Sequence, residues 1–383
     1  MKLAIHNKTD LKKLTVIVLA VIMVFALAAC GGAGGSGETE DNGTDAAQES
    51  VASDSENTGD DAAADEEKEL FQLRMVTQTT NSETIIADRL GFFENEGIQA
   101  VFIGALGQGV TQYQAIATGD LDVFTQGHLT NEAQARLAGL DIKTVQPGFV
   151  DDEEYPHVTY LVREDSDIQS IEDFAGKKVG ISGNGVCIDG YITKYFTEHG
   201  LDPSTVEYVT LPQPGQPEQS VVQGLIDVTT SHSPYSGTAL AAGGVRRAAA
   251  SWDIFESPAA GMATRGFSGA FIEEHPDIVQ GWANAMYHAR VFIEKYPEYS
   301  REISADYLGL DAKDVSLNRW PQEKNIPQDW AEFWFALSEE LEYWKPGDIS
   351  IDEVVTNEFV PTDYPAEYDE IVNTPWEPKG KQE

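Results

Sequence analysis

The sequence predicts an α/β fold of two lobes, and three observations support this prediction. Short runs of β-forming residues alternate with helical stretches, which is typical of βαβ units. This alternation passes through two similar cycles, the second of which starts near His157. Residues 71–383 also number 313, more than one hydrophobic core usually supports, so we expect about two domains.

The first cycle is expected to contain four strands and three helices. We place its strands at residues 73–77, 100–103, 121–125 and 142–145, and its helices at residues 83–90, 110–118 and 131–138. In the second cycle we place strands at residues 159–162, 178–181, 207–211 and 226–229, and helices at residues 186–199 and 216–223. Because strands and helices alternate along the chain, each cycle predicts one α/β lobe.

The chain after about Gly261 is predicted to be helical and aromatic. Helices are expected at residues 277–295 and 327–344, and in the second of these Trp, Phe and Leu recur at near-helical spacing. An aromatic stripe of this kind usually packs in a core, so we expect these helices to return to the first lobe. The alternative is that Trp320 or Trp330 reaches a ligand.

One short motif occurs in both cycles. Gly119–Val123 and Gly224–Val228 share the pattern Gly-x-x-Asp-Val, and each is followed by a threonine and then a histidine, His128 or His232. The glycine suits a left-handed helix cap, and the residues after it suit a buried strand. The polar residues then fall beyond the carboxyl end of the strand, where open α/β sheets bind their ligands.

The N-terminus has the features of an export signal. Four lysines precede an apolar run of sixteen residues, Leu14–Ala29, which is shorter than the ~20 residues of a spanning helix. The run ends in Leu-Ala-Ala-Cys, which resembles the bacterial lipobox. We therefore predict a lipoprotein signal peptide at residues 1–29 and lipidation of Cys30. An ordinary secretory signal is the alternative, and both interpretations place the protein outside the cytoplasm.

An acidic segment follows the signal. Residues 31–69 contain thirteen acidic residues, one lysine, seven glycines and no aromatic residue, so they cannot bury a core. We interpret residues 30–69 as a disordered tether with a span of roughly 35 Å.

The remaining chain is strongly acidic and contains one cysteine. Residues 71–383 carry a net charge of −30, because the signal region contributes +3 and the tether −12 to the total of −39. This surface should repel phosphate backbones, so we expect no nucleic-acid partner, and solubility is its simplest role.

Cys187 is the one cysteine besides Cys30, so no disulfide framework is expected. We expect Cys187 to pack as a small, partly buried residue without a redox role.

The loops after the predicted strands are the candidate ligand-binding segments. Several of them end at helix N-termini, where unpaired backbone N–H groups favour an anionic group. The loop at residues 182–185 is the best example, because its glycines allow close approach to the backbone. An ordinary turn there, and simple helix caps around residue 108, are the alternatives. The candidate residues are Gln78, Thr79, Thr80, Gly107, Gln108, Gly109, His128, Asn184, Gly185, Val186, His232 and Tyr235.

The two histidines of the repeated motif have several interpretations. His128 and His232 are candidates to face each other across a cleft, as donors to a solute or as metal ligands, and a loop position is the alternative. A metal site needs three or four convergent ligands, and no further ligand stands at a recognisable spacing, so we predict no metal. A phosphate loop ending in Gly-Lys-Ser/Thr is also absent from the sequence, and we expect no cofactor.

Four segments of the chain match the motif order of one known family. Residues 87–98 look like its segment A-x-x-x-GYFxxEGL, residues 119–123 like its strand entry G-x-x-D, and residues 167–179 like S-I-x-S-x-x-D-L-x-G-K-x-V. His275-Pro276, with Val279 and Ala289, looks like P-E-x-V and the helix after it. Together they resemble the nitrate, sulfonate and taurine type of solute-binding protein, over residues 73–296. Phe92 and Phe174 depart from the Tyr and Leu that are usual there.

This resemblance implies a type II periplasmic-binding fold, in which two α/β lobes enclose a cleft. Lobe 1 would comprise residues 70–156 and 260–383, and lobe 2 residues 157–259, with crossovers near residues 155–159 and 251–261. The implied function is that of the extracytoplasmic solute-binding component of an ABC importer. We expect a monomer, lipid-anchored to the membrane, that binds a small organic anion such as a sulfonate and presents it to permease subunits.

Other functions on the same fold remain open. The solute could be neutral or zwitterionic and stack on Tyr235 or Trp252, or it could be a pyrimidine precursor. Some proteins of this type synthesise that precursor, and their chemistry needs a reactive lysine and histidine in the cleft. Because the candidate loops contain no lysine, we expect no enzymatic activity and no catalytic residue. Presentation of the solute to a sensor protein is a further alternative.

Overall fold

A computed structural model describes residues 69–106 and 110–382, which belong to one compact unit. The predicted signal peptide, Cys30, nearly all of the tether and Gly107, Gln108 and Gly109 lie outside the described residues. Among the described helices, none combines the length and apolar character that a membrane crossing needs.

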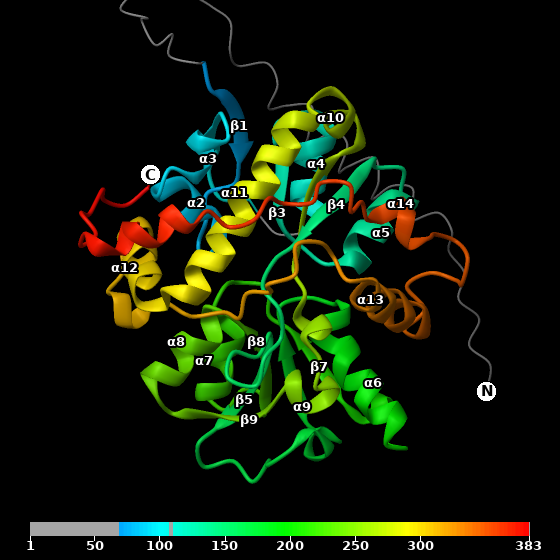
Figure 1. Cartoon of the computed structure of the whole chain (residues 1–383). Coiled ribbons are helices and arrows are strands. Elements are labelled where there is room, and N and C mark those ends of the chain that lie inside the picture. The colour runs from blue at the N-terminus through cyan, green and yellow to red at the C-terminus, as the bar shows by residue number, and fades with distance from the viewer. Residues whose placement is uncertain (1–68, 107–109, 383) are drawn as a thin grey trace, which may run out of the picture. The chain divides into compact units, whose positions relative to one another are not determined.

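The first cycle forms a two-stranded and a three-stranded sheet (Figure 1). β1 (Phe71–Met75) pairs in parallel with β2 (Ile98–Phe102). The sequence did not predict β10 (Thr264–Ser268), which lies between β3 (Val123–Gly127) and β4 (Ile142–Pro147) and is antiparallel to both. The helices of this part are α2 (Glu83–Arg89), α3 (Phe92–Asn95), α4 (Val110–Thr118) and α5 (Leu129–Leu137).

The second cycle forms a five-stranded sheet in the order β7-β6-β8-β5-β9. β6 is parallel to β7 and β8, whereas β5 is antiparallel to β8 and β9. The strands are β5 (Val158–Arg163), β6 (Lys178–Ile181), β7 (Glu207–Thr210), β8 (Val228–His232) and β9 (Val245–Ala250). The helical elements are η1 (Ile171–Phe174), the π-helical turn η2 (Val186–Gly190), α6 (Tyr191–Glu198), η3 (Pro203–Thr205), α7 (Gln216–Val222), α8 (Tyr235–Ala242), α9 (Trp252–Phe255) and η4 (Pro258–Gly261).

The repeated motif has the predicted structure in both cycles. Gly119 follows α4 and Gly224 follows α7, with φ of 74° and 71°, in the left-handed region that glycine adopts most readily. β3 and β8 begin four residues after these glycines. The polar residues of each motif therefore lie at the carboxyl end of its strand, as the sequence predicted.

The C-terminal part is mainly helical. α11 starts with Pro276 in its first turn and ends at Lys295, and its buried face includes Trp282, Met286 and Phe292. It packs against α2, α3 and α12. The elements of this part are α10 (Gly269–Glu274), α11 (Pro276–Lys295), α12 (Pro297–Leu308), η5 (Ala312–Asp314), α13 (Gln328–Glu340), α14 (Ile351–Val354) and η6 (Ala366–Asn373).

The C-terminal helices divide between two large hydrophobic clusters. α11 contributes to a cluster with β1, α2 and α12, which agrees with its expected return to the first cycle. α13 instead joins a cluster that contains residues of the five-stranded sheet, and it packs against α5 and η4. The expectation that both helices return to the first lobe is therefore too simple for α13, because this helix contacts elements of both cycles.

Two crossover segments connect the two cycles, and hydrogen bonds link these segments to each other. The first runs from the end of β4 to the start of β5, and the second from the end of β9 to the start of β10. Gly148 N donates to Ala263 O at 2.7 Å, and Ala263 N donates to Phe149 O at 2.9 Å. Ser251 Oγ donates to Asp151 Oδ1 at 2.8 Å. These bonds hold the two segments side by side.

Candidate functional site

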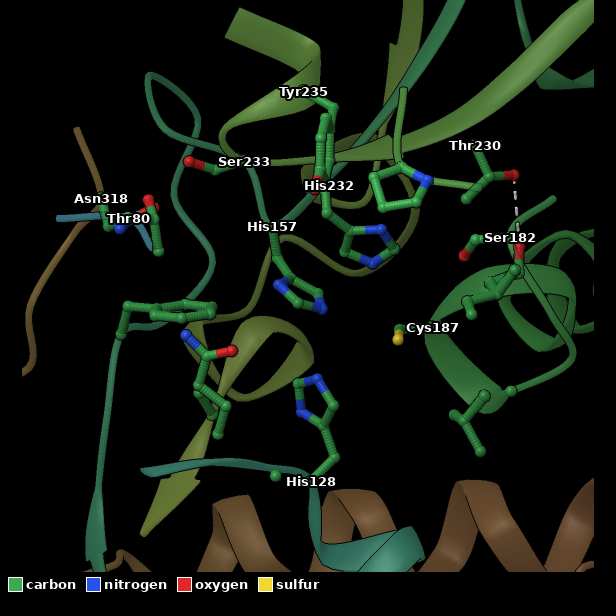
Figure 2. Close-up of a pocket in the computed structure, with 18 of the residues that line it drawn as sticks. Thr80, His128, His157, Ser182, Cys187, Thr230, His232, Ser233, Tyr235 and Asn318 are labelled. Carbon is green, nitrogen blue, oxygen red and sulfur yellow. Dashed lines mark hydrogen bonds between the residues drawn. The ribbon is translucent and has the colours of Figure 1, made fainter. Parts of the chain in front are cut away.

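A cavity of about 670 Å³ lies where strand ends and both crossovers meet (Figure 2). Its volume is within the ~300–1,000 Å³ typical of small-molecule sites. Loops at the carboxyl ends of strands from different sheets line it, including the loops after β1, β3, β6 and β8. The first crossover and α13 complete its wall.

Eight residues proposed from the sequence line this cavity. They are Thr79, Thr80, His128, Asn184, Gly185, Val186, His232 and Tyr235. Each of them lies at or after the end of a strand or at the start of a helix, which is why the sequence could find them.

Gln78, another residue proposed from the sequence, is not among the residues that line the cavity. Its side-chain Nε2 turns back and donates to Val76 O at 2.8 Å, and its backbone N–H donates to Tyr307 Oη at 3.3 Å. Gln78 is thus a buried structural residue, only 4% exposed.

Several cavity residues were missed, and they come from segments without a sequence signal. His157 and Phe149 lie on the first crossover, and Trp334 lies on α13. Trp334 belongs to the aromatic stripe of residues 327–344 for which the sequence predicts core packing, and it is both buried and part of the cavity wall. Trp320 and Trp330, the alternatives proposed from the sequence, are buried and are not among the residues that line the cavity.

His157 stands between the two histidines of the repeated motif (Figure 2). Its ring centroid lies 5.0 Å from that of His128 and 4.8 Å from that of His232. His128 also stacks on Trp334 at 4.9 Å, and its Nδ1 lies 3.0 Å from Met262 O. His128 and His232 are therefore brought to one cavity, but a third imidazole separates them.

Burial keeps these imidazoles neutral. It lowers the pKa of His232 to about 4, with a further contribution from His128. It also lowers the pKa of His128 to about 4, although the bond with Met262 O acts in the opposite direction. The pKa of His157 falls well below the usual value, because burial is reinforced by His232 and His128. At neutral pH each ring thus has one N–H donor and one lone pair.

The cavity wall combines apolar and polar side chains and carries few charges. Among the described lining residues there is no lysine or arginine, and the one carboxylate belongs to Glu218. Glu218 Oε1 accepts a hydrogen bond from Ser231 Oγ, and its Oε2 has no hydrogen-bond partner. Recognition of a solute by the described wall therefore depends on neutral donors such as amides, hydroxyls and imidazoles.

Several helices start at the cavity wall. His128 caps α5, Gly185 precedes η2, and Tyr235 is the first residue of α8. N-terminal N–H groups favour negative charge. The N–H of Gly185 already donates to Asp189 Oδ1 at 2.8 Å, so the loop at residues 182–185 has less free donor capacity than its sequence suggested.

Two adjacent carboxylates on the first crossover should respond oppositely to pH. Burial raises the pKa of Asp151 to about 6, although the His157 N–H and Ser251 Oγ donate to its carboxylate. Partial burial acts to raise the pKa of Asp152 too, but bonds from Glu154 N and the Arg319 guanidinium outweigh it and lower that pKa. The two groups therefore contribute to stability in different pH windows.

Replacing Asp151 by Asn should remove a stability loss that occurs as pH rises. The pKa of Asp151 is higher in the folded chain than in the unfolded chain, so its contribution to stability is fully present below about pH 4. This contribution is lost as pH rises through about 6, which lowers the free energy of unfolding by about 3 kcal/mol. Urea unfolding at pH 4.5 and 8 should show Asp151→Asn gaining stability relative to wild type at the higher pH. Asp152→Asn is the matched control, and it should lower stability at both values. A parallel pH response of the two variants would contradict the prediction.

The two α/β sheet systems, joined by paired crossovers around a cavity, define the type II periplasmic-binding fold. A solved periplasmic aliphatic sulphonate binding protein from Escherichia coli has this fold, with a TM-score of 0.63 and 19% identity over 76% of this chain and 92% of that one. A solved desulfurization enzyme is also similar, with a TM-score of 0.54 and 17% identity over 76% of this chain and 97% of the other.

Residues 78–300 match the family described as NMT1/THI5 like, and the chain belongs to this family. A putative aliphatic sulfonates-binding protein from Bacillus subtilis is 25% identical over 280 residues, which cover 71% of this chain and 81% of that protein. These findings confirm the resemblance that the four sequence motifs indicated.

Proposed function

We propose that the protein is the extracytoplasmic solute-binding component of an ABC importer, which captures a small organic anion and presents it to permease subunits. The observation that carries this proposal is the composition of the cavity wall. Strand ends from different sheets and a connecting crossover contribute to one cavity. Movement about two crossovers would close such a cavity over a solute and change the outer surface that a permease contacts.

A sulfonate is the proposed solute class. The related Bacillus and Escherichia proteins are named for aliphatic sulfonates. In this chain, helix starts and the side chains of Thr80, Asn184 and Ser233 offer neutral donors to the cavity. The sulfonate oxygens are acceptors only, so a wall rich in N–H and O–H groups would bind them without a formal positive charge.

We propose a binding role without catalysis. The fold itself also supports an enzyme, as the desulfurization enzyme shows. In this cavity the candidate nucleophile is Cys187, and burial raises the pKa of its thiol to about 12. A thiol reacts as its thiolate, so without a bound metal Cys187 would be unreactive at neutral pH.

The location proposed for the protein is the outer face of the membrane. A lipid on Cys30 would anchor the chain, and the acidic segment at residues 30–69 would separate the folded unit from the surface by roughly 35 Å. A single chain contains the whole described cavity, and a monomer is the proposed state.

A thermal-shift panel tests the solute class. The full chain would be heated with alkanesulfonates, nitrate, thiamine pyrimidines, and acidic, neutral and basic amino acids. A sulfonate at 100 times its dissociation constant should add about 2.7 kcal/mol and raise Tm in a saturable way. Asn184→Ala should reduce the shift by removing a wall donor, while the exposed Asn373→Ala should leave it unchanged. Shifts with uncharged or cationic compounds alone would refute the sulfonate proposal.

A further inference from the structure

Two histidines and the one cysteine of the described chain converge inside the cavity. One ligand atom each from His128, His157 and Cys187 lies within 4.8 Å of the other two. The three residues come from distant segments, namely the start of α5, the first crossover and the π-helical turn η2. Figure 2 shows the His157 ring between those of His232 and His128, with the Cys187 sulfur beside them. The sequence spacing gave no indication of this cluster.

The His157 side chain has an unused ring nitrogen. His157 is only 8% exposed, and its Nε2 is buried without a hydrogen-bond partner. Its backbone is held firmly, because His157 N donates to Asp151 Oδ1 at 2.7 Å. A buried polar atom without a partner is uncommon in a folded protein and calls for a partner that the chain itself does not supply.

The surroundings of His128 suit a metal ligand. Its Nδ1 faces Met262 O at 3.0 Å, and an N–H there would donate to this carbonyl. Nε2 then keeps its lone pair on the other side of the ring. A ligand histidine usually donates its second N–H to a carbonyl or carboxylate in this way, and the Trp334 stack fixes the ring further.

We propose that His128, His157 and Cys187 form a binding site for a divalent transition metal, with zinc as the best match, whose fourth coordination position opens to the cavity. Imidazole nitrogen and thiolate sulfur are the ligands that zinc prefers. Three protein ligands with one open position are typical of zinc sites that also bind a small molecule.

The distances call for a modest closure of the cluster. Tetrahedral zinc with its usual bond lengths holds two ligand atoms about 3.3–3.6 Å apart, so the atoms now within 4.8 Å would approach by about 1 Å. His128 follows β3 and Cys187 follows β6, which belong to different sheets. Closure of the cavity would therefore also bring the ligands together.

A bound metal would supply the positive charge that the described cavity wall lacks among its side chains. An anionic solute could then occupy the open coordination position. This last step rests on the proposed function, whereas the metal site itself does not.

Zinc binding can be tested on the full chain with Cys30→Ser, which leaves Cys187 as the one thiol. Equilibrium dialysis with elemental analysis should give one zinc per chain. Cobalt(II) in place of zinc should give a thiolate-to-cobalt charge-transfer band, which can come only from Cys187. Absence of stoichiometric zinc, or of this band, would overturn the proposal. This test does not depend on whether variants of the ligand residues fold.

Variants identify the ligands. His157→Gln should weaken zinc binding at least tenfold, and Cys187→Ser should remove the charge-transfer band. His199→Gln is the matched control, because His199 lies on the surface and stacks on Tyr195. Zinc affinity that is the same in His157→Gln and His199→Gln would show that zinc binds elsewhere.

A sulfonate titration separates the metal site from the proposed function. Zinc-loaded chain should bind the sulfonate at least tenfold more tightly than chelator-treated chain. Equal sulfonate affinity in both forms would overturn the open coordination position. If zinc binds to the cluster but no sulfonate binds to either form, the metal site stands and the proposed solute class fails.

Discussion

Replacing Arg265 by Met is expected to lower the free energy of unfolding by about 3–5 kcal/mol, because the change leaves a buried carboxylate without its partner. Arg265 Nε donates to Glu83 Oε1 at 2.8 Å, and its Nη2 donates to Glu83 Oε2 at 3.1 Å. The two residues are 2% and 1% exposed and connect β10 to α2. Arg265 Nη1 also donates to Thr125 O, so its loss removes a bond to β3 as well.

Two further variants isolate this effect in urea unfolding experiments. The double change Arg265→Met with Glu83→Leu should recover much of the loss, since it removes both charges and keeps the volume. Arg163→Met, which breaks the exposed pair with Asp165, should cause no resolvable change. The slope of free energy against urea concentration should stay constant in all three variants. Equal midpoints for Arg265→Met and Arg163→Met would show that the buried pair contributes little.

Trp334→Ala is expected to cost a similar 3–5 kcal/mol and also to weaken solute binding. Trp334 is fully buried, and its Nε1 donates to Ala259 O at 2.8 Å. On its other side it stacks on His128 and forms part of the cavity wall. The substitution therefore leaves a void in the core and frees the His128 ring at the same time.

Trp344→Ala separates packing from binding. Trp344 belongs to the same hydrophobic cluster and is 5% exposed, but it is not among the residues that line the cavity. Chemical denaturation should show that both variants are destabilised, while calorimetric titration should show weaker solute binding for Trp334→Ala alone. Equal loss of solute affinity in both variants would mean that general destabilisation, rather than the cavity wall, explains the effect.

The sequence predicted most elements of the two cycles because local patterns determine them. The strands that became β3 and β8 follow a helix-ending glycine, and each starts with a buried valine, Val123 or Val228. β10 was missed, because Thr264–Ser268 contains an arginine and a glycine and lies within the part of the chain that is predicted to be helical. Its pairing with β3 and β4 depends on contacts more than a hundred residues apart. Gly266 is needed for this pairing, since a Cβ there would lie 1.9 Å from Lys143 O and only glycine fits.

The residues of the candidate site that lie at strand ends could be predicted from the sequence. Thr80 and Asn184 follow strand ends and His232 ends β8, and a general rule places ligands there. His157 and Trp334 reach the cavity through a crossover and a C-terminal helix, whose positions depend on the assembled tertiary structure. The proximity of Cys187 to His128 and His157 also depends on the tertiary structure, so it could not be predicted from the sequence.

The position of α13 has a consequence for how the molecule is made. The other walls of the cavity come from residues 79–318, and Trp334 adds the last one. A ribosome must therefore translate the chain through α13 before the cavity can be complete. A prematurely terminated chain that stops before α13 would contain both strand systems and yet lack the indole that supports His128. A complete cavity wall thus requires a chain that extends through α13.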